Sequence, residues 1–162
     1  MRKLKIALEG PINGCTDSDC QDWRKKAIAD LGEYYDFHNP MDLDCRGKEQ
    51  EMEQRLVDFD TAGIASSDII LAMADKPTWG TAMGIQMAWA MHKNIIVVCP
   101  SDKPSPWLRN RTTSMFNNFD DAIDLLLSMA KLGRELDAMV SRVNAGVPLA
   151  DDPSITTQWV TK

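Results

Sequence analysis

Residues 57–100 read VDFDTAGIASSDIILAMADKPTWGTAMGIQMAWAMHKNIIVVCP. Two short apolar runs in this stretch, residues 69–73 and 95–99, are rich in β-branched side chains and have the length of buried strands. Between them, residues 79–91 carry apolar side chains at helical spacing. A strand, a helix and a second strand in this order predict a βαβ unit with parallel strands. Because ligands of open parallel sheets bind beyond the carboxyl ends of the strands, the turn at residues 75–81 is the first candidate site.

The rest of the chain continues the alternation of strands and helices. Further strands are predicted at residues 3–9, 34–38 and 112–116. Further helices are predicted at residues 19–31, 49–66, 107–111 and 121–143. This order predicts a doubly wound α/β fold of flavodoxin or Rossmann type, with a five-stranded parallel sheet and an added C-terminal helix. We expect a single domain over residues 1–145 and an extended tail over residues 146–162.

The composition is that of a soluble globular protein. A length of 162 residues fits one domain with one core. The formal net charge of -6 argues against a nucleic-acid polymer as partner, since such binding needs a basic surface, but it does not exclude a nucleotide. The apolar run after Met1 is too short for a signal peptide, and no stretch reaches transmembrane length. We therefore predict a cytoplasmic protein without a membrane partner.

The cysteines and histidines show no pattern that would bind a metal. Cys15, Cys20, Cys45 and Cys99 form no CxxC motif, and the two histidines lie far apart in sequence. Reduced thiols, no metal site and no cofactor are the expectation.

Two glycine-bearing loops are candidates for ligand binding. Gly10 and Pro11 follow the first predicted strand, and glycine there permits close backbone approach to a ligand. Thr78, Gly80 and Thr81 open the helix of the central unit and offer two hydroxyls beside free backbone N–H groups. Neither loop fits the Walker or GxGxxG patterns, so the alternative of an ordinary turn stays open.

Two carboxylates and two outlying side chains complete the candidate set. Glu9 ends the first strand and shares a strand face with Ala7, so it is a candidate general acid or base, or an acceptor for a ribose hydroxyl. A solvated position at the rim is the alternative. Asp68 immediately precedes a buried strand, where it acts in catalysis or bonds a nearby loop or helix end. Arg46 and Trp107 are further binding candidates, with Trp107 either stacking on a nucleobase or packing its loop.

Several motifs resemble those of the nucleoside 2-deoxyribosyltransferases and related nucleotide N-glycosidases. They are the opening KIALEGP, HNP after the second strand, D-x-x-x-I-x-x-S-D before the third, G-T-x-x-x-x-x-x-A after it, and SPWLRN with FDDAIDLL near the end. The similarity covers residues 3–127. The resemblance implies a five-stranded parallel sheet, cleavage of the bond between a base and 2-deoxyribose, and a homo-oligomer in which a neighbour's loop completes the site.

The family's catalytic positions are only partly kept in this chain. Asp68 matches one of the family's acidic residues, and Gly10, Pro11, Gly80 and Thr81 match its backbone elements. The nucleophilic Glu corresponds to Gly84, the orienting Tyr to Ala7, and one Asp to Thr78. Glycine cannot attack a sugar carbon, which excludes covalent catalysis through the family's own residue.

Three functions therefore remain open. The first is an N-glycosidic transferase or hydrolase that uses Glu9 and Asp68 in place of the lost residues. The second is a catalytically silent protein that binds a nucleoside, nucleotide or signalling nucleotide, and the third is a structural protein that uses only the scaffold. The last helix keeps an apolar stripe beyond the length that the sheet needs, which predicts either a homo-oligomer contact or packing on its own domain.

Overall fold

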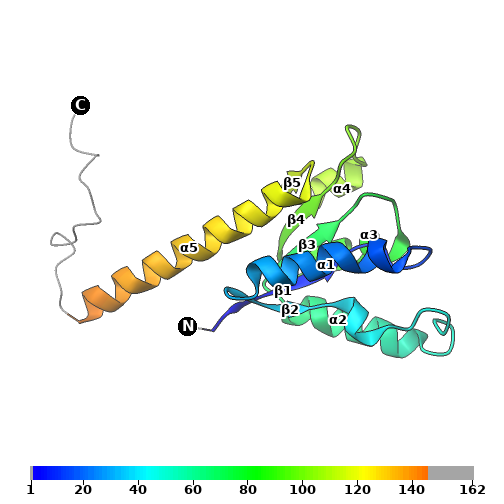
Figure 1. Cartoon of the computed structure of the whole chain (residues 1–162), viewed down its shortest axis with the longest axis horizontal. Helices are drawn as coiled ribbons and strands as arrows, with labels where there is room; N and C mark the ends of the chain where they lie inside the picture. The colour runs from blue at the N-terminus through cyan, green and yellow to red at the C-terminus, as the bar shows by residue number, and fades with distance from the viewer. Residues whose placement is uncertain (1, 146–162) are drawn as a thin grey trace. The chain divides into compact units, whose positions relative to one another are not determined.

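A computed structural model describes residues 2–145, so the tail predicted at residues 146–162 lies outside the described residues. The chain forms two compact units, Met1–Leu126 and Leu127–Lys162, which are described separately. The strands are β1 (Leu4–Glu9), β2 (Tyr35–His38), β3 (Ile69–Met73), β4 (Asn94–Val98) and β5 (Ser114–Phe116) (Figure 1). The helices are α1 (Asp17–Leu31), the 3-10 helix η1 (Pro40–Leu43), α2 (Glu53–Ser66), α3 (Trp79–Ala90), α4 (Pro106–Asn110) and α5 (Phe119–Asn144). All predicted strands and helices are confirmed, most of them within two residues at each end.

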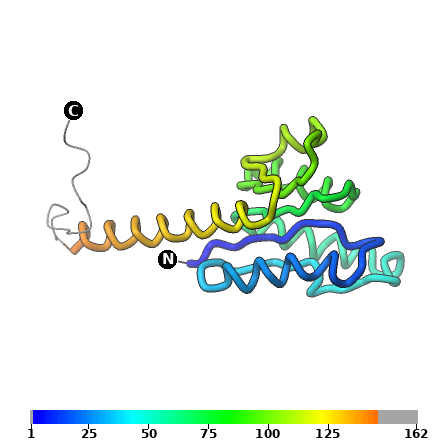
Figure 2. The backbone as a smooth tube through the Cα atoms, turned by 45° about the horizontal axis from the view of Figure 1, so that its top comes forward, coloured from blue at the N-terminus to red at the C-terminus, as the bar shows by residue number. Residues whose placement is uncertain are grey.

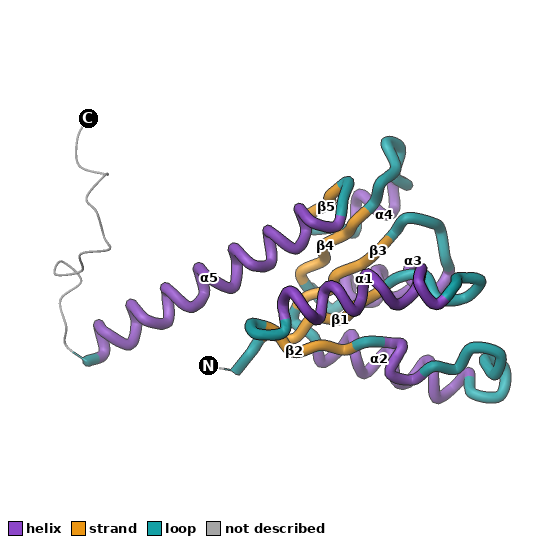
Figure 3. The backbone as a smooth tube through the Cα atoms, in the orientation of Figure 1, coloured by secondary structure: helices purple, strands orange, loops and turns teal. Residues whose placement is uncertain are grey.

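The five strands form one parallel sheet in the order β2-β1-β3-β4-β5 (Figure 3). This is a doubly wound α/β fold of the flavodoxin type, as the sequence predicts. The strand order reverses at β1, which pairs with β2 on one side and β3 on the other. In that register Glu9 lies beside Ala72 of β3. Glu9 therefore ends the strand at the point where such sheets bind their ligands.

The two faces of the sheet bury different helices. Ala7, together with alternate residues of β3 and β4, packs with Ile64 of α2 and with Ile85 and Ala88 of α3. On the other face, α1 and the first turns of α5 meet through an edge contact between the rings of Trp23 and Phe119, 6.2 Å apart. Because side chains two residues apart share a strand face, Glu9 follows Ala7 onto the face that α2 and α3 cover.

Local hydrogen bonds fix where the helices begin. Thr16 and Asp19 form a reciprocal capping box at the start of α1, and the Asn118 side chain accepts a bond of 2.9 Å from the backbone N–H of Asp121 in α5. The helix predicted from residue 49 begins only at Glu53, because Glu51 and Met52 both donate to the carbonyl of Lys48 in a preceding turn. That turn and η1 form a loop beyond the end of β2.

The last helix, α5, is unbroken over its whole length (Figure 2). Its first turns bury Ala122, Ile123 and Leu126. Further along, Leu132 and Leu136 are more than half exposed.

Between residues 2 and 145, no helix combines the length and the apolar character that crossing a membrane requires.

Candidate functional site

A cavity of about 460 Å³ opens at the carboxyl ends of the strands. Its volume falls within the range of small-molecule sites. The loops after β1, β2 and β3 form its walls together with α2 and the first turns of α3. Six of the residues proposed from the sequence line it together: Glu9, Gly10, Arg46, Thr78, Gly80 and Thr81.

Glu9 is the most unusual side chain in this cavity. It is 6% exposed, and no described residue donates a hydrogen bond to its buried Oε1. Burial raises the pKa of Glu9 to about 7, the nearby charge of Asp60 adds to the rise, and the positive charge of Arg24 opposes it. A carboxyl group that is half protonated near neutral pH can donate or accept a proton during catalysis.

Gly84 of α3 makes room for the Glu9 carboxylate. A Cβ atom at position 84 would lie 2.7 Å from Oε2 and 3.1 Å from Cδ of Glu9, both closer than van der Waals contact. Glu9 therefore occupies the space that a side chain at position 84 would need.

Substituting Gly84 tests this arrangement. We expect Gly84→Ala to lower the free energy of unfolding by about 1–3 kcal/mol, because the added methyl group displaces a buried side chain. Gly80→Ala is the matched control, since its added Cβ has no atom within 4 Å apart from its chain neighbours and the backbone of its own helix. The measurement is urea unfolding of both variants, alone and combined with Glu9→Ala, which should remove the cost at position 84. Equal effects at positions 80 and 84 would contradict the contact.

Arg24 of α1 binds the loop that follows Glu9 and was not predicted from the sequence. Its guanidinium is 1% exposed and donates to the carbonyl oxygens of Cys20 and Gly10, the latter at 2.9 Å, while stacking on the ring of Trp23. Burial lowers the pKa of Arg24 to about 10, and the charge of Glu9 partly offsets that fall. The arginine thus fixes the Gly10 loop and keeps a positive charge near the carboxylate.

Asp60 of α2 is a second carboxylate in the cavity wall. Its Oδ1 lies 3.8 Å from Nε2 of His38, and the His38 ring is buried against Gly63 and tilted over Phe59. His38 thus packs against α2 and lies beside Asp60. Asp60 is the first Asp of the D-x-x-x-I-x-x-S-D motif. The sequence therefore contained a signal for Asp60, but only Asp68 of this motif was predicted as a site residue.

Removing the charge of Asp60 should change the titration of Glu9. We expect Asp60→Asn to lower the pKa of Glu9 below about 7, because the like charge that discourages ionisation is gone. Carboxyl carbon chemical shifts of ¹³C-labelled Glu9, followed through a pH titration, measure this. Asp58→Asn, a change of the same kind on an exposed position of α2, is the control and should leave the titration unchanged. An unchanged Glu9 pKa in Asp60→Asn would mean that burial and the charge of Arg24 set the value without Asp60.

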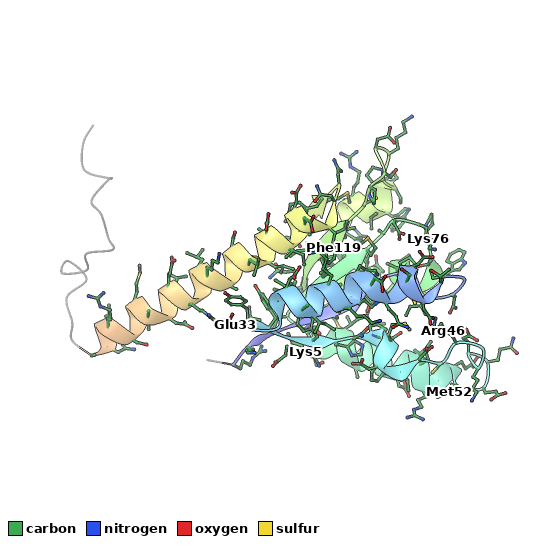
Figure 4. All side chains as sticks on the ribbon, in the orientation of Figure 1. Lys5, Glu33, Arg46, Met52, Lys76 and Phe119 are labelled. Carbon is green, nitrogen blue, oxygen red and sulfur yellow. The ribbon has the colours of Figure 1, made fainter. Side chains whose placement is uncertain are left out.

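The charged side chains of the cavity wall are mainly acidic, and the one cation among its described residues is already paired. Arg46, which is labelled in Figure 4, binds Asp44 through two hydrogen bonds of 2.8 and 2.6 Å and also binds Asp17 at the start of α1. Asp44 and Glu49 add further carboxylates to the wall. On the opposite side the hydroxyls of Thr78 and Thr81 bond to each other at 2.7 Å.

Three candidates from the sequence do not line the cavity: Pro11, Asp68 and Trp107. Asp68 lies at the amino end of β3, where it accepts bonds from Arg2 and from the backbone N–H of Lys5. The Arg2 guanidinium holds the pKa of Asp68 below its usual range. Trp107 of α4 is 72% exposed. Asp68 therefore connects the start of β1 to the start of β3. Bonding a neighbouring segment is one of the two roles that the sequence left open for it.

Within the described range of 2–145, no three His, Cys, Asp or Glu side chains gather closely enough to hold a metal ion. The four cysteines are free thiols.

No protein-family model matches this chain, and no curated protein matches it in sequence. Solved structures match its fold. A 2-deoxyribosyltransferase from Bacillus psychrosaccharolyticus is 16% identical with a TM-score of 0.59, over 74% of this chain and 90% of that one. A CMP N-glycosidase from Clostridium botulinum is also 16% identical, with a TM-score of 0.54 over 75% and 97%. A molybdenum cofactor binding protein from Rippkaea orientalis is 14% identical, with a TM-score of 0.55 over 80% and 98%. At these identities the likeness shows a shared fold.

Proposed function

We propose that the cavity binds a nucleoside or a related small molecule and that Glu9 acts as the acid–base group at its N-glycosidic bond. The observation that carries this proposal is the Glu9 carboxyl group, buried in the cavity wall over Gly84 with a pKa of about 7. Two proteins of the same fold are named as a deoxyribosyltransferase and a CMP N-glycosidase, which supports a bond of this class.

The proposed reaction is hydrolysis, with Glu9 first as acid and then as base. Protonated Glu9 gives its proton to the base as the bond between the sugar C1′ and the base nitrogen breaks, and the bonding electrons leave with the base. A water oxygen then bonds to C1′, and its proton returns to Glu9. The Asp60 carboxylate in the same wall stabilises the positive charge that develops on the sugar. The products are free sugar and free base.

The charge of the wall favours a ligand without phosphate. Four carboxylates line the cavity, against one guanidinium that already binds two aspartates. We therefore expect a deoxynucleoside to bind at least about ten-fold more tightly than its 5′-monophosphate. Titration calorimetry at low and high salt measures this difference in affinity. Added salt should reduce it, because salt screens the repulsion between the phosphate and the carboxylates. Tighter binding of the monophosphate would show that Arg46 leaves its aspartate partners to take the phosphate.

A catalytically silent binding protein is the second candidate. Gly84 and Ala7 stand where the family has its nucleophile and its orienting Tyr, which favours a protein without turnover. The family's backbone elements Gly10, Gly80 and Thr81 are kept and line the cavity, as binding of a ligand requires. In that case ligand affinity depends on the cavity wall, and Thr81 substitutions weaken it with no turnover to lose.

The first test is to incubate the purified protein with deoxynucleosides, ribonucleosides, their monophosphates and nicotinamide dinucleotides. Chromatography then separates released base from ligand that stays intact on the protein. Free base formed at a rate proportional to protein concentration supports the enzyme. An intact compound that co-elutes with the protein supports the silent binder. Neither release nor retention would reject both functions.

Two further expectations from the sequence stay part of this proposal: a homo-oligomer and a cytoplasmic location. The support for an oligomer at the cavity is that Trp79 and Met83, on its rim, are 88% and 66% exposed. Large apolar side chains exposed together are typical of an interface.

A further inference from the structure

The second half of α5 presents a row of apolar side chains that are exposed or only half-buried. We call this row the α5 seam and define it by Met129, Leu132, Leu136, Met139 and Val143. Leu132, Leu136 and Val143 are 57%, 52% and 53% exposed. The spacing alternates between three and four residues, which is the a and d pattern of a coiled coil. Val140, which is 56% exposed, borders the seam on one side, and a second helix packed on the seam would cover it as well.

We propose that the α5 seam binds the same seam of a second copy of this chain as an antiparallel two-stranded coiled coil. This surface lies outside the cavity, and the inference does not depend on the proposed function. The seam is self-complementary, because in an antiparallel pair each a position faces a d position. Leu136 then packs against the second copy's Met139, and Leu132 packs against the second copy's Val143. The two-fold axis repeats both contacts, as a closed dimer requires.

The charged residues beside the seam favour the antiparallel direction. Glu135 and Arg142 precede a positions and carry opposite charges. In an antiparallel pair these flanking positions face each other, so each Glu135 lies near the second copy's Arg142, twice per dimer. In a parallel pair Glu135 faces Val140 and gains no charge partner. The other flank, Gly133 and Val140, carries no charge that would oppose pairing.

The seam is short, which sets how strongly it should associate. From Met129 to Val143 a helix rises about 21 Å at 1.5 Å per residue. A single helix of this length is only marginally stable in water. Pairing would therefore stabilise the helix at the same time as it buries the seam. We therefore expect an association that depends on protein concentration.

Sedimentation equilibrium of the full chain under reducing conditions tests the dimer. The expected result is a mass that rises from one chain toward two as the concentration increases. Leu136→Glu, which places a charge in the seam, should weaken the association at least about ten-fold. Ser141→Glu adds the same charge on the outer face of α5 and is the matched control. Circular dichroism and thermal unfolding check that both variants stay folded.

A charge exchange tests the direction of pairing. Glu135→Arg should weaken the dimer by bringing two arginines together, and Glu135→Arg combined with Arg142→Glu should restore it. Restoration supports the antiparallel pair, and its failure overturns that direction. A protein that is monomeric at all concentrations overturns the proposal, as does a dimer that Leu136→Glu leaves unchanged or an assembly of three chains. A monomer in which Leu136→Glu lowers the melting temperature would mean instead that the seam packs on its own chain.

Discussion

Glu9→Gln should reduce turnover at least about one hundred-fold while changing ligand affinity only a few-fold. General acid–base groups typically contribute factors of 10² to 10⁴ to the rate, and glutamine keeps the shape of glutamate but cannot cycle a proton. Ligand affinity should persist because the wall, its Arg24 support and the space over Gly84 stay unchanged. Steady-state kinetics on any substrate found by the base-release test, with calorimetry on the same variant, separate the two quantities.

The pH dependence gives an independent check on this role. Because protonated Glu9 donates the proton, kcat/KM should fall as the pH rises through about 7, where Glu9 loses that proton. Glu51→Gln makes the same chemical change in an exposed turn outside the cavity and should keep the wild-type rate and profile. Normal turnover in Glu9→Gln, or a rate that rises through pH 7, would remove Glu9 from the role of acid.

The placement of Glu9 followed from the sequence because it depends on local geometry. Alternation along a strand puts residues 7 and 9 on one face, and strand order puts the carboxyl ends at the ligand edge. The partner of Glu9 could not be predicted in the same way. Gly84 lies 75 positions later in the chain, and its closeness to Glu9 depends on the angle at which α3 crosses the sheet. Only the three-dimensional packing shows that these two positions compete for one space.

Asp68 shows the opposite case, because the sequence left two roles open for it and only its position in the structure separates them. The motif D-x-x-x-I-x-x-S-D contains both Asp60 and Asp68, and sequence reasoning chose the one that precedes the strand. A residue before a strand lies at its amino end, far from the ligand edge, whereas Asp60 lies on α2 and faces the cavity. Arg24 gave no sequence signal at all, because a buried arginine looks like any helical arginine until its partners are known.

The raised pKa of Glu9 should also make the stability of the protein depend on pH. Its pKa of about 7 in the folded state lies above the ordinary value of 4.5, so between these values the folded protein holds a proton that the unfolded chain has released. The free energy of unfolding therefore falls as pH rises through this window. A difference of about 2.5 pKa units corresponds to about 3 kcal/mol at full effect.

The Glu9→Gln variant has no ionisable group at position 9, so its free energy of unfolding should not fall in this way as the pH rises. Relative to the wild type, we expect the variant to gain up to about 3 kcal/mol in unfolding free energy between about pH 4 and about pH 8. Urea unfolding of both proteins across this range measures the gap, and Glu51→Gln, measured alongside, should show none. A gap that stays flat would mean that Glu9 titrates alike in the folded and unfolded chains, and the cavity would lose its acid. A difference in unfolding free energy that grows with pH is the expected result. It would mean that ionised Glu9 destabilises the fold, as expected of a group retained for its chemistry.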